Sequence, residues 1–305
     1  MTGEWPWKGR IDADEGADAL RWHQVVRPHG AGAPPGIALV GFACDEGVRR
    51  NQGRPGAVEG PRVLRQALAN LAWHGDRPLW DAGDVACMDG DLEGAQERLG
   101  SAVSALVGAG HLPIVLGGGH ETAWGSFLGL AAAYPGRRIG IVNLDAHFDL
   151  RTSPRASSGT PFAQIAGRCE RAGLPFDYLC IGIAEPANTA ALFNVAQRLG
   201  VRFRLDDEVS DASLPELAAE IQAFAADADM LYLSIDLDVL PAWVMPAVSA
   251  PAARGVAPGH VEALIEAVRG TGKLAIADVV EFNPCHDLDS RGARTAARLI
   301  WRLAR

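Results

Sequence analysis

Residues 139–149 read Ile-Gly-Ile-Val-Asn-Leu-Asp-Ala-His-Phe-Asp, a short apolar run that passes directly into three metal-capable side chains. The run is too short for an ordinary helix and is rich in branched residues, so it predicts a buried strand. Alternate residues of an extended chain point to the same side, so Asp145 and His147 can face one site, and a small bend adds Asp149. The stretch therefore predicts a polar site at the end of a buried strand.

Similar apolar runs recur along the chain and alternate with amphipathic or alanine-rich segments that predict helices. This alternation favours an α/β fold with a parallel sheet covered on both faces. In such sheets ligands bind beyond the carboxyl ends of the strands. The expected strands are 36–43, 113–116, 139–144, 178–183, 201–205, 231–235 and 274–280 with a weaker one near 78–81, and examples of the helices are 61–72, 92–109, 215–226, 258–269 and 291–303.

Two further motifs follow apolar runs in the same way. Gly-Gly-Gly-His-Glu occupies 117–121, and Ser-Ile-Asp-Leu-Asp occupies 234–238. Burying so many carboxylates together is strongly unfavourable without compensating positive charge, which metal ions supply. Six ligands are too many for one zinc site, and a majority of carboxylates without thiolates favours Mn²⁺. The sequence predicts two Mn²⁺ per chain, held by His120, Asp145, His147, Asp149, Asp236 and Asp238.

Composition limits the class of protein and its partners. The 305 residues carry a formal net charge of −9, and no basic stripe is visible, so neither nucleic acid nor an anionic membrane is an expected partner. The five cysteines include no Cys-x-x-Cys pair, which indicates reduced thiols in a cytoplasmic protein. Residues 1–35 are polar and rich in Gly, Pro and Trp, so we expect an irregular N-terminal arm followed by one catalytic domain, 36–305.

The three motifs together resemble those of the ureohydrolase superfamily, which comprises arginases, agmatinases and formimidoylglutamases. The resemblance runs from about residue 36 to the C-terminus. It implies a three-layer α/β/α sandwich with a mostly parallel eight-stranded sheet, and a homo-oligomer. It also implies a hydroxide, bridging two Mn²⁺, that attacks a guanidinium or amidine carbon. The implied ligands are His120, Asp145, Asp149 and Asp236 for one ion, and Asp145, His147, Asp236 and Asp238 for the other.

The pattern points away from arginases within this superfamily. Arginases usually have Gly-Gly-Asp-His at the first motif, and they place a proton-shuttling His at about the position of Phe162, which cannot shuttle a proton. Ser-Ser-Gly-Thr-Pro-Phe at 157–162 resembles formimidoylglutamases, as do the segments 51–57 and 245–251. The implied reaction cleaves N-formimidoyl-L-glutamate to L-glutamate and formamide, a step of histidine degradation.

Such a substrate carries two carboxylates and a cationic amidine, so the site should present groups of both signs. Glu281 matches the family's acidic residue that holds the =NH₂⁺ group. Arg151 and Arg155 can grip carboxylates, and Ser158 and Asn188 are further candidate contacts. The alternatives are another ureohydrolase, an agmatinase or guanidinobutyrase that releases urea, and a metal-binding protein without turnover.

Overall fold

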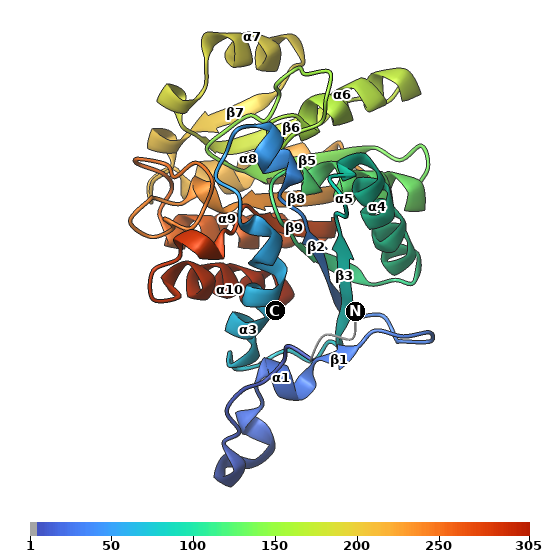
Figure 1. Ribbon diagram of the computed structural model, residues 1–305. Helices are drawn as coiled ribbons and strands as arrows, with labels where there is room; N and C mark the ends of the chain where they lie inside the picture. The colour runs from blue at the N-terminus through green and yellow to red at the C-terminus, as the bar shows by residue number, and fades with distance from the viewer. Residues whose placement is uncertain (1–4) are drawn as a thin grey trace.

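Nine strands form one parallel sheet at the centre of the computed structural model, which describes residues 5–305 (Figure 1). Their spatial order is β1-β3-β2-β4-β9-β8-β5-β6-β7. Every strand expected from the sequence is present, and every pairing among the described strands is parallel. The strands are β1 Arg27–Pro28, β2 Ile37–Ala43, β3 Leu79–Ala86, β4 Leu112–Leu116, β5 Ile139–Leu144, β6 Asp177–Ile183, β7 Arg202–Leu205, β8 Met230–Asp236 and β9 Leu274–Val280.

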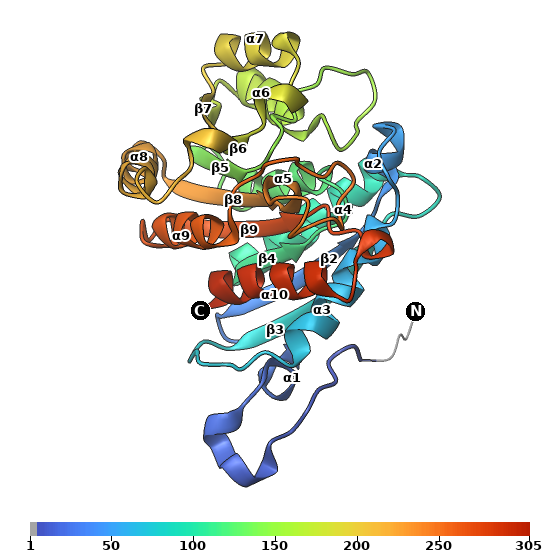
Figure 2. The same ribbon diagram turned by 90° about the vertical axis from the view of Figure 1, so that its left-hand side faces the viewer.

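Helices cover both faces of the sheet and complete the three-layer α/β/α sandwich that the sequence predicted (Figure 2). Prolines stand in the first turn of α3, α6, α8 and α9, where the missing N–H costs no hydrogen bond. One layer contains α3 Gly60–Ala69, α8 Leu214–Ala226, α9 Pro258–Arg269 and α10 Arg291–Ala304, and the other contains α4 Leu92–Gly108, α5 Thr122–Ala133, α6 Pro161–Ala172 and α7 Ala190–Arg198.

Alternate residues of the central strands supply two separate cores. In β5, Val142 and Leu144 pack against the layer of α8 and α9, whereas Ile141 packs against the layer of α5 and α6. Because both faces are buried, the strands are almost continuously apolar and not alternating. A polar side chain inside such a strand has no solvent to face, which marks Asn143 and Ser234 as exceptions that need partners.

The N-terminal segment corrects one expectation. Residues 1–4 of the expected irregular arm lie outside the described residues, but the rest contains a short helix and the added strand β1. Trp7 stacks on Trp22, and its indole N–H donates to Asp81 at 2.6 Å, so part of the arm is packed on the body. The sheet has nine strands and not the eight expected. The ninth, β1, was not expected because it consists of two residues, one of them a proline, which give no recognisable strand pattern. The remaining short elements are α1 Trp22–Val25, α2 Glu46–Arg50 and the 3₁₀ helices Ala13–Ala19, Ala57–Glu59, Glu185–Ala187, Asp206–Glu208, Leu237–Val239 and Pro284–His286.

Topology brings the three motifs together. The four central strands lie in the order β4-β9-β8-β5, so the carboxyl ends of the strands that precede the motifs meet at one edge. The chain runs from β4 to β5 across the positions of β8 and β9, which makes this edge the switch point where α/β sheets bind ligands. In residues 5–305, no helix is both long and apolar enough to cross a membrane.

Candidate metal centre

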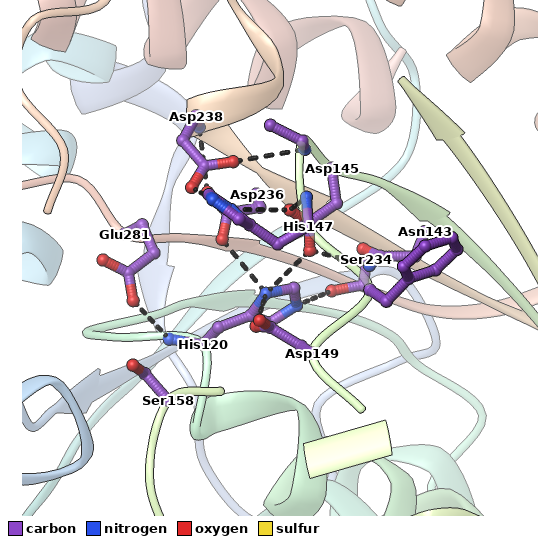
Figure 3. A network of polar contacts seen from close by, with 12 residues as sticks. His120, Asn143, Asp145, His147, Asp149, Ser158, Ser234, Asp236, Asp238 and Glu281 are labelled. Atoms are coloured by element: carbon purple, nitrogen blue, oxygen red, sulfur yellow. Dashed lines mark hydrogen bonds and ion pairs between the residues drawn. The ribbon is translucent and has the colours of Figure 1, made fainter. Parts of the chain in front are cut away.

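Six predicted ligand side chains converge beyond the carboxyl ends of β4, β5 and β8 (Figure 3). His120 Nδ1 lies 3.2 Å from a carboxylate oxygen of Asp145, and 3.0 Å from oxygens of Asp149 and Asp236. His147 Nδ1 lies 3.0 Å from a carboxylate oxygen of Asp238. The ligand atoms within each group lie within 4.8 Å of one another, and the two groups are His120, Asp145, Asp149 and Asp236, and Asp145, His147 and Asp238.

The sequence suggested that an extended chain lets Asp145 and His147, and likewise Asp236 and Asp238, face one site. In the structure a tight turn brings each pair together. The N–H of His147 donates to Asp145 Oδ1 at 2.6 Å, and the N–H of Asp238 donates to Asp236 Oδ1 at 2.8 Å. Each first aspartate thus accepts the N–H two residues later, as Asp side chains do in turns. Asp149 has φ +48°, a left-handed conformation that costs free energy and that the surrounding structure must enforce.

The electrostatics of the cluster fit bound cations. Burial acts to lower the pKa of His120, but three carboxylates outweigh it, so the pKa lies well above its ordinary value. Burial, Asp238 and Asp145 raise the pKa of Asp236 well above the ordinary range of a carboxyl group. Both shifts show that the site lacks positive charge when only protein groups are present. The arrangement of acceptors around His120 Nδ1 is therefore suited to a divalent cation, which would replace the protons.

A buried chain of hydroxyl groups fixes the orientation of His120. Asp278 accepts hydrogen bonds from Ser126 Oγ at 2.8 Å, from Ser234 Oγ at 2.7 Å and from the Tyr232 hydroxyl. Because Ser234 gives its only proton to Asp278, it must accept from His120 Nε2, which lies 3.0 Å away. In the neutral imidazole that binds a metal ion, the proton is then on Nε2, and the Nδ1 lone pair faces the three carboxylates, as metal-ligating histidines require.

Replacing Asp278 with asparagine should weaken divalent metal binding by about 10–100-fold, because outer-shell partners have effects of that size. The amide can donate to Ser234 and so reverse the chain that orients His120. Metal affinity measured by titration calorimetry on folded variants checks this. Asp289→Asn, in an exposed loop before α10, serves as the control. An unchanged metal affinity in Asp278→Asn would show that Asp278 does not contribute to metal binding.

Aromatic and amide groups hold the other side of the cluster. Asn143 Nδ2 donates to Asp145 Oδ2 at 2.8 Å and lies 2.9 Å from the Tyr178 hydroxyl. Phe162 packs edge-on against His120 with ring centroids 5.2 Å apart, and it stacks on Tyr178. Phe162 is fully buried. At the position where arginases have a proton-shuttling His, this chain therefore has a phenyl ring that packs against the metal-ligand candidate His120.

A cavity of about 280 Å³ opens over the metal groups, lined by ligands and by candidate substrate contacts. Glu281 is 3% exposed, and its Oε1 accepts the N–H of His120 at 2.9 Å. Burial raises the pKa of Glu281 to about 7, against the opposing effects of Ser249 and of this N–H. Further lining residues are Asn51, Gln52, Gly53, Arg151, Ser158, Leu192 and Ala250.

A second cavity of about 630 Å³ shares Asn51, Arg151 and Leu192 with the first and extends outward. Within residues 5–305, no carboxylate forms an ion pair with Arg151 or Arg155, and both side chains are exposed. Arg50, by contrast, is paired with Glu46 and Glu93. Two arginines thus remain available to a ligand, Arg151 beside the metal groups and Arg155 in the outer cavity only.

Asn188 requires a correction, since its side chain is committed to the protein backbone. Its Oδ1 accepts the N–H of Phe148 at 3.1 Å, and its Nδ2 donates to the carbonyls of Ala146 and Ala184 at 2.9 Å. It is buried and does not line the cavity over the metal groups. Asn188 therefore supports the loop that carries Asp145, His147 and Asp149, and it is not a substrate contact.

Comparison with known proteins agrees with this geometry. The model of the arginase family matches residues 35–305. This chain belongs to the arginase family. Among its arginase-family relatives, formimidoylglutamase of Chromobacterium violaceum is 60% identical over 98% of this chain and 97% of its own length. Formimidoylglutamase of Aeromonas hydrophila is 56% identical over 97% and 96%.

Solved structures give the same result for the fold. The structure of Trypanosoma cruzi formiminoglutamase with Mn²⁺₂ aligns with a TM-score of 0.80 and 28% identity, covering 88% of this chain and 92% of that one. As a member of the arginase family, the chain is a hydrolase, and its His and Asp groups are placed to hold two metal ions.

Sequence reasoning missed several residues that support the metal-ligand side chains. Asn143 and Ser234 each lie two residues before a ligand aspartate, inside strands that are otherwise apolar. A polar residue in a strand buried on both faces was a usable signal, since it must find a hydrogen-bond partner. Tyr178 and Tyr232 carried no such signal, because a tyrosine ring also suits an ordinary core position, and Ser126 carried none because a serine is most often exposed.

Proposed function

We propose that this protein is a formimidoylglutamase, which hydrolyses N-formimidoyl-L-glutamate to L-glutamate and formamide. Arg151, which has no acidic partner in the part of the chain that the structure describes, lines the same cavity as the metal groups and Glu281, and this observation carries the proposal. The cavity thus offers a cation for a carboxylate beside an acidic group for an amidinium. Relatives named formimidoylglutamase, up to 60% identical over nearly the whole chain, support the same choice.

We propose two Mn²⁺ as the cofactors of this reaction. The protein groups fit them, because the donors are carboxylates and imidazoles, and His120 Nδ1 faces three carboxylate oxygens at 3.0–3.2 Å. When bound, the two cations acidify a water molecule and stabilise the negative charge that attack on the amidine carbon produces. One ion would be held by His120, Asp145, Asp149 and Asp236, and the other by Asp145, His147 and Asp238, so Asp145 belongs to both groups. The resemblance to the superfamily adds Asp236 to the second set.

The chain's own residues orient the substrate. The Glu281 carboxylate, 3% exposed beside the ligands, is placed to hold the cationic =NH₂⁺ end. Arg151 can hold a substrate carboxylate through two parallel hydrogen bonds, and Ser158, whose Oγ lies 3.2 Å from Asn51 Nδ2, adds a hydroxyl. Arg155 faces the outer cavity and suits the second carboxylate. Fixing both ends of the substrate places the amidine carbon at the metal groups, where close approach lowers the barrier to attack.

Three further assignments are part of this proposal. Residues 36–305 form one catalytic domain, which the family match over residues 35–305 supports. The protein is cytoplasmic, which five free cysteines support, and it does not bind nucleic acid, which the net charge of −9 supports. It is a homo-oligomer, which rests on the resemblance to the superfamily alone.

A substrate panel tests the proposal. Purified protein supplied with Mn²⁺ should release formamide and glutamate from N-formimidoyl-L-glutamate, and it should release no urea from agmatine or 4-guanidinobutyrate. Formamide and urea are assayed in parallel, and metal content is measured on the same preparation. Urea from a guanidino compound would instead indicate another ureohydrolase. One metal ion or none, with no activity on any amidine, would indicate a binding protein without turnover.

A further inference from the structure

Glu121 directly follows the ligand His120, yet it does not line the cavity over the metal groups. Its side chain is fully buried. Its Oε1 accepts the N–H of Gly47 at 3.0 Å, and its main-chain carbonyl accepts a hydrogen bond from Gln96 Nε2 at 2.7 Å. The residue therefore joins the loop that carries His120 to α2, a segment 74 positions earlier in the sequence.

Two glycines leave the space that the Glu121 carboxyl group occupies. A Cβ atom added to Gly47 would lie 2.4 Å from the carboxyl carbon of Glu121, and one added to Gly119 would lie 2.2 Å from its Oε2. Side chains at either position would displace the carboxyl group, since such contacts are far closer than van der Waals distance. The carboxyl group is thus packed between the backbone of α2 and that of the His120 loop.

Glu121 also replaces the missing cap of α2. The N-cap residue Asp45 makes no capping hydrogen bond to its own helix, because one of its oxygens accepts the N–H of Gly56 at 2.7 Å. The first N–H groups of a helix have no partner within the helix and need an acceptor from elsewhere. Glu121 supplies that acceptor to Gly47, so the start of this five-residue helix depends on a distant side chain.

The helix α2 leads directly into a wall of the cavity. Asn51, Gln52 and Gly53 all line the space above the metal groups. The N–H of Asn51 donates to the carbonyl of Gly47 at 2.9 Å, so the position of the wall follows the start of the helix. Asn51 in turn donates to Ser158, which belongs to the loop that carries Arg151.

We propose that Glu121 is a positioning residue that sets the wall formed by residues 51–53 at the correct distance from the metal groups. It acts on substrate binding through α2, and it does not act on the metal ions. The identity of the substrate used below rests on the proposed function, but the link from Glu121 to α2 does not.

Replacing Glu121 with alanine tests the link directly. In Glu121→Ala, amide hydrogen exchange of residues 46–53 should accelerate about tenfold, as expected for loss of one hydrogen bond, while exchange of residues 139–149 stays unchanged. The KM for N-formimidoyl-L-glutamate should rise about tenfold with the metal content per chain retained. Glu121→Gln keeps an oxygen acceptor for the Gly47 N–H, so it should stay close to the wild type in both measurements.

A second variant approaches the same contact from the other side. Gly47→Ala places a methyl group against the Glu121 carboxyl, so it should also raise KM with the metal content retained. Combining it with Glu121→Ala removes the two closest contacts, those with the carboxyl group at 2.4 Å, and leaves the approach of 2.7 Å to the Cβ atom of residue 121. The combined effect of the two substitutions should therefore be smaller than the product of the two single effects. Gly108→Ala, at the end of α4, is the control, because a Cβ there meets nothing within 4 Å.

Unchanged exchange of residues 46–53 in Glu121→Ala would overturn the proposal. Loss of metal in parallel with activity would also overturn it, since Glu121 would then act on the metal centre. Independent effects of the Gly47 and Glu121 substitutions on thermal stability would show that the two residues are not coupled. If the wild type fails to hydrolyse N-formimidoyl-L-glutamate, the proposed function fails, whereas exchange and coupling still test Glu121.

Discussion

Asp236→Asn should lose more than about 100-fold in turnover, because loss of a mere outer-shell partner already costs about 10–100-fold. Asparagine keeps the size of the side chain and removes its charge. Asp236 Oδ2 lies 3.0 Å from His120 Nδ1 inside a buried cluster, so the change removes a charge that is proposed to serve both cations. Formamide release and metal content of the purified variant, measured together, check the prediction.

Removal of the metal from the wild type provides the matched comparison. Chelation should abolish turnover and lower the melting temperature, since ions that bind only the folded state stabilise it by mass action. Added Mn²⁺ should restore both properties in the wild type but not in Asp236→Asn. Turnover in Asp236→Asn equal to that of the wild type would show that its bridging role is wrong.

Arg151→Ala should raise the KM for N-formimidoyl-L-glutamate by about 10–100-fold, the size expected when a hydrogen bond to a charged group is lost. Arg151 has no acidic partner among residues 5–305, so its guanidinium is free to hold a substrate carboxylate at the edge of the cavity. The guanidinium lies outside the metal groups, so kcat should fall less than kcat/KM. Steady-state kinetics with both constants determined separately provide the test.

Two variants sharpen this result. Arg151→Lys keeps the charge but loses the planar pair of donors, so it should recover only part of the affinity. Arg155→Ala, which changes the outer cavity alone, should have a smaller effect than Arg151→Ala. An unchanged KM in Arg151→Ala would contradict the proposed contact.

Much of the architecture could be predicted because it follows from local patterns. The seven clear apolar runs became strands, and 274–280 agrees with β9 to the residue. The weaker run near 78–81 is the start of β3, which continues to Ala86 through residues that are partly exposed at one side of the sheet. The two-residue strand β1 could not be found, because pairing with β3 and not its own composition makes it a strand.

The candidate site could be predicted in part, for a different reason. Each ligand motif was visible because carboxylates and imidazoles directly after a buried strand are costly unless they are used. Asn188 was misjudged because an Asn in a loop is equally compatible with binding a ligand and with holding a backbone, and only its three backbone contacts decide. Glu121 and Asp278 received no role in the chemistry, since their partners lie on distant segments.

The sequence by itself determined the layered α/β class, the ligand types and the need for cations, because each depends on residue type and short spacing. The tertiary structure alone decided which segments meet: the order β4-β9-β8-β5, the proton on His120 Nε2, the support from Asp278 and Asn188, and the contact between Glu121 and α2. The physical reason is the distance along the chain over which each interaction acts. Strand propensity and charge crowding act over a few residues, whereas hydrogen bonds between distant segments exist only after the sheet has brought those segments together.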